Sequence, residues 1–297
     1  DAEITAEANP DSMTDDFLTV SRASGVNRLS MGIQSANDRE LRAIGRIHTF
    51  AQAQDAFFRA RRAGFANLSV DLMYALPNQR MEQLCASLDA LLDLQPEHLS
   101  CYGLTLEAHT PLGRQHPVLP DEDTQADMYL AASEILRDYG YVHYEISNFA
   151  KKGFSSKHNM KYWTGGEYLG FGPTAASDFA GKRFTIVRDL RGYIDGIAQK
   201  GTVLSECEAI PPRERAGEYV MLRLRTSDGI SAEEYERQYL MPFAPLEKAM
   251  KRFSEKGFAE YVNERWRLTE SGWLVSNQII LTLNTLQERS TPFAKKR

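Results

Sequence analysis

The N-terminal half of the chain alternates between short apolar runs and longer amphipathic stretches. The apolar runs are typical of buried strands, which we expect at residues 3–8, 28–34, 67–76, 98–107 and 141–147. An apolar stripe with helical spacing predicts helices over residues 15–23, 38–45, 50–64, 81–94 and 124–140. This βαβα order predicts an α/β fold in which a parallel sheet with helical crossovers forms part of a barrel.

Local signals support these boundaries. Thr14, Asn37 and Thr49 each stand directly before a predicted helix and are expected to cap it, and Gly64 is expected to end the third. A doubly wound sheet is the alternative to a barrel. No GxGxxG follows any predicted strand, which disfavours a dinucleotide-binding fold.

The pattern changes after Phe149. Residues 1–150 are expected to form the partial barrel, and residues 151–208 a connecting segment rich in glycine, serine and aromatic residues. Residues 209–297 predict a small domain of helices followed by a two-stranded hairpin and a terminal helix, which is winged-helix-like.

Polar residues interrupt three of the predicted strands near their carboxyl ends. These are Glu7, Gln34 and Asp71, and Arg46 lies in the loop after the second strand. In α/β barrels such ends converge on one cavity. A carboxylate there can accept both hydroxyls of a ribose, and arginine can bind a carboxylate with two parallel bonds. Together the four residues suit a nucleoside joined to an amino acid; the alternative is ordinary helix caps, loop anchors and a surface ion pair.

The sequence HNMKYW brings His158, Asn159, Tyr162 and Trp163 together in a predicted loop. An imidazole can ligate heme iron axially, and aromatic faces can stack on a porphyrin, so His158 is a candidate iron ligand. The alternative is a structural histidine with satisfied hydrogen bonds.

Composition narrows the classes of partner. The net charge is −5, which argues against nucleic acid and against a DNA-binding regulator built on the C-terminal domain. No run approaches the roughly 18 apolar residues of a membrane span, although peripheral membrane contact is left open. The three cysteines Cys85, Cys101 and Cys207 follow no metal-ligand spacing and fit a reducing, cytoplasmic location.

The phrases EANP, SMGIQS, GRIHT, VDLMYALP, YEISNFA and HNMKYW occur in this order along the chain. In this combination the chain resembles the HemW-type heme chaperones, radical S-adenosylmethionine (SAM) proteins related to oxygen-independent coproporphyrinogen III oxidase. The resemblance implies a partial radical-SAM (β/α) barrel that lacks its first units, followed by a HemN-type C-terminal domain. It also implies SAM contacts at Glu7, Gln34, Arg46 and Asp71, and heme contacts in the HNxxYW motif.

Two departures from that family stand out. The cluster-binding CxxxCxxC motif is absent, and relatives usually carry a histidine near the position of Ala176. We therefore expect the 4Fe-4S ligands in an N-terminal part that this chain lacks, and no radical chemistry from the chain alone. The strand at residues 3–8 is then expected at the edge of its sheet.

The resemblance implies a protein that binds heme and SAM and delivers heme to acceptor proteins, with a possible homodimer in the complete protein. The alternative is the oxygen-independent coproporphyrinogen III oxidase itself, because fold and cofactor do not settle function. The HNxxYW motif belongs to the chaperone-like branch and favours the first reading.

Overall fold

A computed structural model describes residues 2–199 and 201–292. They form two compact units, and the chain passes from the first to the second between Ser156 and Lys157. Each unit is described separately below.

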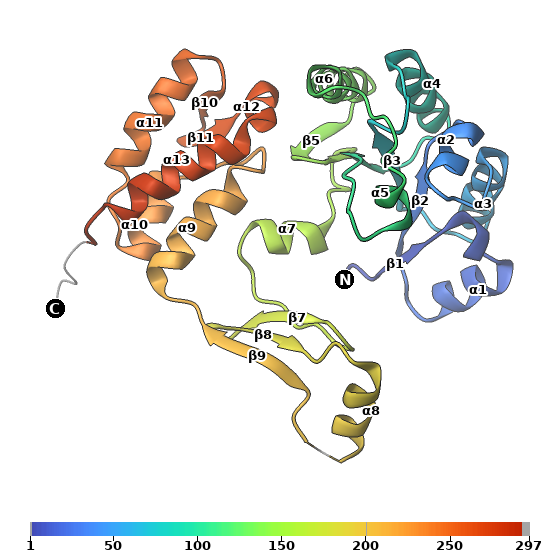
Figure 1. The fold of residues 1–297 in the computed structure, drawn as a ribbon, viewed down its shortest axis with the longest axis horizontal. Helices are drawn as coiled ribbons and strands as arrows, with labels where there is room; N and C mark the ends of the chain where they lie inside the picture. Colours follow the sequence, from blue (N-terminus) through green and yellow to red (C-terminus); the bar gives the residue numbers. More distant parts are fainter. Residues whose placement is uncertain (1, 200, 293–297) are drawn as a thin grey trace. The chain divides into compact units, whose positions relative to one another are not determined.

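The first unit is built on an open six-stranded sheet with the strand order β1-β2-β3-β4-β6-β5 (Figure 1). The first four strands are parallel, and β1 pairs within the described residues with β2 alone. The expected partial α/β barrel and the edge position of residues 3–8 are thus confirmed. The strands are β1 Thr5–Ala8, β2 Arg28–Gln34, β3 Leu68–Tyr74, β4 His98–Gly103, β5 Val142–Glu145 and β6 Asn148–Ala150.

Strand β6 departs from the parallel pattern that the sequence predicted, while β5 runs in the same direction as β4. After β5 the chain turns back, and β6 pairs antiparallel with both β4 and β5. The three residues of β6 are all buried, so they carry no alternation of apolar and polar positions that would mark a strand. The fourth strand is also shorter than expected and ends at Gly103.

Helices flank this sheet, and their caps follow the sequence signals. The side chains of Thr14, Asn37 and Thr49 accept backbone N–H groups of the first turns that they precede. Gly64 has φ +89°, the left-handed conformation that ends the third helix. The helices are η1 Pro10–Ser12, α1 Asp15–Ala23, α2 Asp38–Ala43, α3 Phe50–Arg62, α4 Met81–Leu92, α5 Pro111–Arg114 and α6 Glu122–Asp138.

The core lies between the sheet and the helices α3, α4 and α6 (Figure 1). The predicted apolar faces point into it: Phe57 of α3 and Leu84 and Leu88 of α4 are fully buried. Burial of one such side chain stabilises the fold by about 1.5–3 kcal/mol. This packing fixes the carboxyl ends of β1, β2 and β3.

The second unit begins with a helix and contains a three-stranded antiparallel sheet, β7-β8-β9, and a separate hairpin, β10-β11. The hairpin and the helices around it agree with the predicted C-terminal elements. The sheet β7-β8-β9 was not predicted, because residues 176–209 show little periodicity. The elements are α7 Lys157–Trp163, β7 Ala176–Phe179, β8 Lys182–Ile186, α8 Leu190–Ala198, β9 Leu204–Ala209, α9 Pro212–Arg223, α10 Ala232–Tyr239, α11 Ala244–Glu255, β10 Ala259–Val262, β11 Arg265–Leu268, α12 Glu270–Leu274 and α13 Ser276–Glu288.

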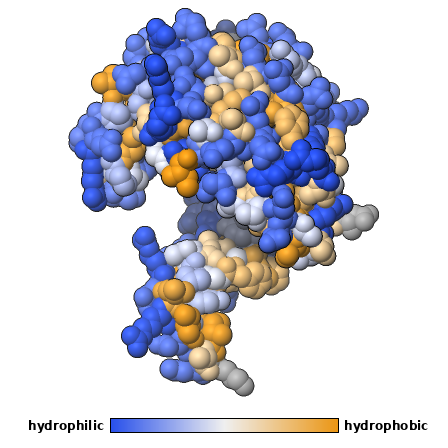
Figure 2. Space-filling model, turned by 90° about the vertical axis from the view of Figure 1, so that its right-hand side faces the viewer, coloured by the Kyte–Doolittle hydropathy of each residue, from blue (hydrophilic) through white to orange (hydrophobic). Residues whose placement is uncertain are grey.

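Helix α8 presents apolar side chains to solvent. Leu190, Ile194 and Ile197 are each more than half exposed, and they recur at helical spacing. In Figure 2, hydrophobic residues gather on the surface of the segment formed by β7–β9 and α8. Among the described residues, no helix has the length and apolar character to cross a membrane.

Candidate functional site

The first unit holds a polar pocket of about 320 Å³ along the end of β1, the second half of β2 and the middle of β3, where Asp71 lies. The four side chains predicted from the strand ends and the following loop, Glu7, Gln34, Arg46 and Asp71, all line it. The expectation that they share one cavity is therefore confirmed. That they bind SAM stays a prediction.

The register of the parallel strands brings the carboxylates to this pocket. Glu7 lies opposite Ser30 on the neighbouring strand, and the Ser30 hydroxyl donates to Asp71 Oδ1 at 3.4 Å. Burial raises the pKa of Asp71 to about 6; the hydrogen bond from Ser100 opposes this shift, and the charge of Glu7 adds to it. A carboxylate kept in such a costly position is typical of a functional site.

Gln34 reaches the pocket through an unusual backbone conformation. Its φ is +76°, which a non-glycine residue adopts at a cost, and the pairing of β2 with β3 is irregular between Met31 and Gln34. The side chain is 3% exposed, and the Tyr102 hydroxyl donates to its Oε1 at 3.1 Å. Gln34 is therefore held in one orientation before any ligand arrives.

Arg46 is held by its own loop and by the first strand. Its Nη1 donates to Asn9 Oδ1 at 2.6 Å. Two residues later the buried His48 places Nε2 3.2 Å from the backbone oxygen of Ile33, and burial lowers the pKa of His48. A neutral His48 thus fastens the Arg46 loop to the end of β2.

The side chains of the pocket have the chemistry that an amino-acid-bearing nucleoside requires. A Cβ atom added at Gly32 would lie 3.0 Å from Gln34 Nε2 and 3.3 Å from Asn9 Oδ1, so the glycine keeps the space between these groups open. The carboxylates of Glu7 and Asp71 and the amide oxygen of Gln34 can accept hydrogen bonds from hydroxyl and ammonium groups. The guanidinium of Arg46 can donate two parallel hydrogen bonds to a carboxylate.

The sequence prediction missed other residues of this site, among them Asn9, Ser30 and Gly32 of the lining, and Tyr102, which binds Gln34. Asn9 is part of the EANP phrase, and Ser30 and Gly32 alternate with apolar residues along β2. Such alternation inside a buried parallel strand is the signal that identifies a polar face. Nothing in the sequence pairs Tyr102 with Gln34, 68 positions away.

A buried network holds the turn that follows Gln34. Glu40 is 4% exposed, and its Oε2 accepts hydrogen bonds from the Ser35 hydroxyl at 2.6 Å and from Gln79 Nε2 at 3.2 Å. Burial raises the pKa of Glu40. The network links the turn after β2, which directly follows the pocket residue Gln34, to the loop after β3.

The residues that the structure describes do not fit a 4Fe-4S cluster. Cys85 lies on α4, Cys101 is buried in β4 and Cys207 is exposed on β9. No three metal-binding side chains come together among the described residues.

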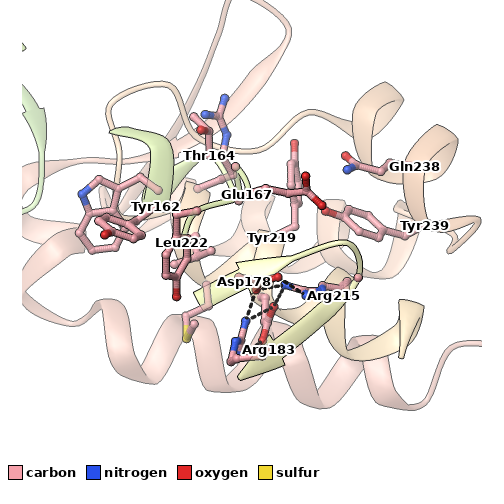
Figure 3. Close-up of a pocket in the computed structure, with 18 residues that line it drawn as sticks. Tyr162, Thr164, Glu167, Asp178, Arg183, Arg215, Tyr219, Leu222, Gln238 and Tyr239 are labelled. Carbon is pink, nitrogen blue, oxygen red and sulfur yellow. Dashed lines mark hydrogen bonds and ion pairs between the residues drawn. The ribbon is translucent and has the colours of Figure 1, made fainter. Parts of the chain in front are cut away.

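The HNMKYW motif forms helix α7, not the loop that its composition predicted. Tyr162 and Trp163 line a second pocket, of about 370 Å³, within the second unit (Figure 3). Its other aromatic walls are Tyr168, Tyr219 and Tyr239. His158 and Asn159 belong to the same helix and are not among the residues that line this pocket.

An ion network forms one side of this second pocket. Arg183 and Arg215 each bind both Asp178 and Glu218 (Figure 3). Hydrogen bonds from Arg215 hold the pKa of Asp178 below its usual range. The sequence prediction missed all four residues, because the pairs join positions up to 37 residues apart.

Outside this ion network, Arg223 also lines the pocket and is 8% exposed. Its ion pair with Asp228 spans 3.6 Å, longer than the bonds within the network. The sequence offers no signal for it beyond a basic residue on the apolar side of an amphipathic helix.

Comparison with known proteins joins both halves of the chain to one family. The sequence model described as radical SAM superfamily matches residues 1–91, and that of the HemN C-terminal domain matches residues 210–275. The curated heme chaperone HemW of Bacillus subtilis is 36% identical over 94% of this chain and 75% of its own length. The chain belongs to the HemW heme chaperone family. The HemW protein of Escherichia coli is 32% identical, with 94% of this chain and 74% of that protein covered.

A solved structure shares its fold with nearly the whole chain. The coproporphyrinogen III oxidase HemN of Escherichia coli, described as a radical SAM enzyme, superposes with a TM-score of 0.81 over 96% of this chain and 70% of that chain. The two sequences are 23% identical, so this likeness supports the fold alone. Membership of the radical SAM superfamily implies SAM and a 4Fe-4S cluster as the family's cofactors.

Proposed function

We propose that this chain binds heme through its second unit and delivers it to acceptor proteins, while its first unit holds SAM. One observation carries the proposal: a chain of the HemW family, whose curated relatives are named heme chaperones, presents Tyr162 and Trp163 of HNMKYW on the wall of an aromatic pocket. The alternative, coproporphyrinogen III oxidase, has a structural likeness at 23% identity in its favour.

Heme in this proposal is cargo. The face of Trp163 offers a stacking surface for the macrocycle, and Tyr162 brings its phenol group to the same wall. His158 and Asn159 lie on the same helix outside the pocket lining, and His158 is hydrogen-bonded to Tyr162. Among the ion pairs of the described residues, Arg223 takes part in one, with the carboxylate of Asp228 at 3.6 Å. Its guanidinium therefore suits a heme propionate.

SAM in this proposal lies in the pocket of the first unit. Asp71 and Glu7 accept the ribose hydroxyls, Arg46 binds the amino-acid carboxylate, and Gln34 accepts from the ammonium group. In radical SAM proteins a cluster supplies the electron that cleaves SAM. This chain's own residues bind and orient the molecule.

Transfer of heme to an apoprotein tests the proposed function. The chain is loaded with one equivalent of ferric heme and mixed with an apo-hemoprotein whose absorbance changes on heme uptake. We expect the apoprotein to take up the heme from this chain faster than from heme-loaded serum albumin. Failure to transfer, or decarboxylation of coproporphyrinogen III by the same preparation, would overturn the assignment.

Three finer features belong to the same proposal: a cytoplasmic location, a homodimer and peripheral membrane contact. Helix α8 supports the homodimer and the membrane contact, because exposed apolar side chains suit a protein or membrane surface. These side chains are Leu190, Ile194 and Ile197.

A further inference from the structure

Two side chains of the HNMKYW motif form a hydrogen-bonded pair. Tyr162 and His158 stand one turn apart on α7, and the Tyr162 hydroxyl lies 3.0 Å from His158 Nε2. The two rings meet edge to face, with centroids 4.9 Å apart and an interplanar angle of 88°. The spacing of four residues places both side chains on the same face of the helix.

Only one member of this pair faces the pocket. Tyr162 lines the 370 Å³ cavity (Figure 3), and its side chain is 37% exposed. The centroid of its ring lies 4.6 Å from the centroid of the Tyr168 ring. His158 is not among the lining residues, and its Nε2 is directed at the phenol oxygen. The hydrogen bond therefore joins a tyrosine that lines the pocket to an imidazole on the same helix that does not.

Tyrosine is an established type of axial ligand for heme iron. A phenol oxygen must lose its proton to ligate ferric iron strongly, and a hydrogen-bonded imidazole can accept that proton. His158 Nε2 is within the 2.6–3.2 Å range at which such proton transfer occurs.

We propose that Tyr162, and not His158, supplies the iron ligand when heme binds, with His158 as the positioning residue that receives the tyrosine proton. On binding, the O–H bond of Tyr162 breaks, an Fe–O bond forms, and the proton moves to His158 Nε2. The iron stays ferric throughout. This inference rests on the proposed function, because it requires heme at the HNMKYW motif.

The ligand is identified by the spectrum of the ferric heme complex. Wild type, Tyr162→Phe, His158→Ala and the control Tyr261→Phe, at an exposed tyrosine of the hairpin, are each loaded with ferric heme. Resonance Raman and visible absorption then report iron–phenolate vibrations and charge-transfer bands. Circular dichroism confirms that each variant is folded.

We expect the iron–phenolate signature in wild type, His158→Ala and Tyr261→Phe, and its loss in Tyr162→Phe. The His158→Ala variant is expected to bind heme more weakly than wild type with the signature retained. An imidazole-ligated spectrum that disappears in His158→Ala and persists in Tyr162→Phe would overturn this inference and leave the proposed function standing. The absence of heme binding by wild type would overturn the proposed function itself.

Discussion

Replacing Asp71 by asparagine is expected to stabilise the protein at pH 7 and, at the same time, to weaken SAM binding. The pKa of Asp71 is raised to about 6 in the folded state, from an ordinary value near 3.8, mainly by burial. The folded state therefore holds the Asp71 proton more tightly than the unfolded state. The protonated Asp71 carboxyl therefore adds to the free energy of unfolding below about pH 4, and this contribution is lost as the pH rises through 6.

At pH 7 the ionised carboxylate thus costs about 1–3 kcal/mol, a cost that asparagine does not carry. We expect urea unfolding at pH 7 to show a higher free energy of unfolding for Asp71→Asn by about that amount. The gain should shrink as the pH falls from 6 towards 4. The control Asp93→Asn, at an exposed position, should change little at either pH.

SAM binding by Asp71→Asn is expected to fall about tenfold to a hundredfold, because a hydrogen bond to a charged acceptor is lost. Equilibrium dialysis against SAM measures it. A variant that is more stable and binds SAM as wild type does would show that Asp71 is not a ligand-binding group.

Replacing Glu40 by alanine is expected to destabilise the first unit by about 2–4 kcal/mol. The side chain is 4% exposed and accepts hydrogen bonds from Ser35 and Gln79, so its removal leaves both donors buried without this acceptor and opens a cavity. Because Ser35 directly follows Gln34, we also expect weaker SAM binding. Urea unfolding and equilibrium dialysis measure the two effects.

Two further variants separate the causes of the Glu40 effect. Glu40→Gln keeps the size and an acceptor oxygen and is expected to lose less than half as much stability. Glu134→Ala, on the exposed face of α6, should stay within about 0.5 kcal/mol of wild type. A Glu40→Ala variant as stable as Glu134→Ala would contradict the role assigned to the network.

The fold of the first unit was largely predictable because its signals are local. The cap of Thr49 and the stop at Gly64 mark α3 within a few positions of its ends. Non-local features were missed for the same reason. The reversal into β6 follows from pairing with β4, across about 50 residues, and leaves no local trace beyond three buried residues.

The same division holds for the candidate sites. Glu7, Gln34 and Asp71 were found because a polar residue interrupts an apolar run, but the φ of +76° that turns Gln34 inward is a property of the folded chain. In the second pocket, Arg215 and Asp178 lie on elements with no sequence signal in common. The motif HNMKYW pointed to the pocket, while its helical state, and with it the Tyr162–His158 pair, required the structure.

Titration of the chain with ferric heme tests the central claim most directly. Soret absorbance is followed for wild type, Trp163→Ala in the pocket and Tyr261→Ala on the exposed hairpin. The account predicts saturation at one heme per chain for wild type and Tyr261→Ala, and about tenfold weaker binding for Trp163→Ala, since a stacking contact is lost. Heme uptake that never saturates, or that is the same in all three proteins, would contradict it.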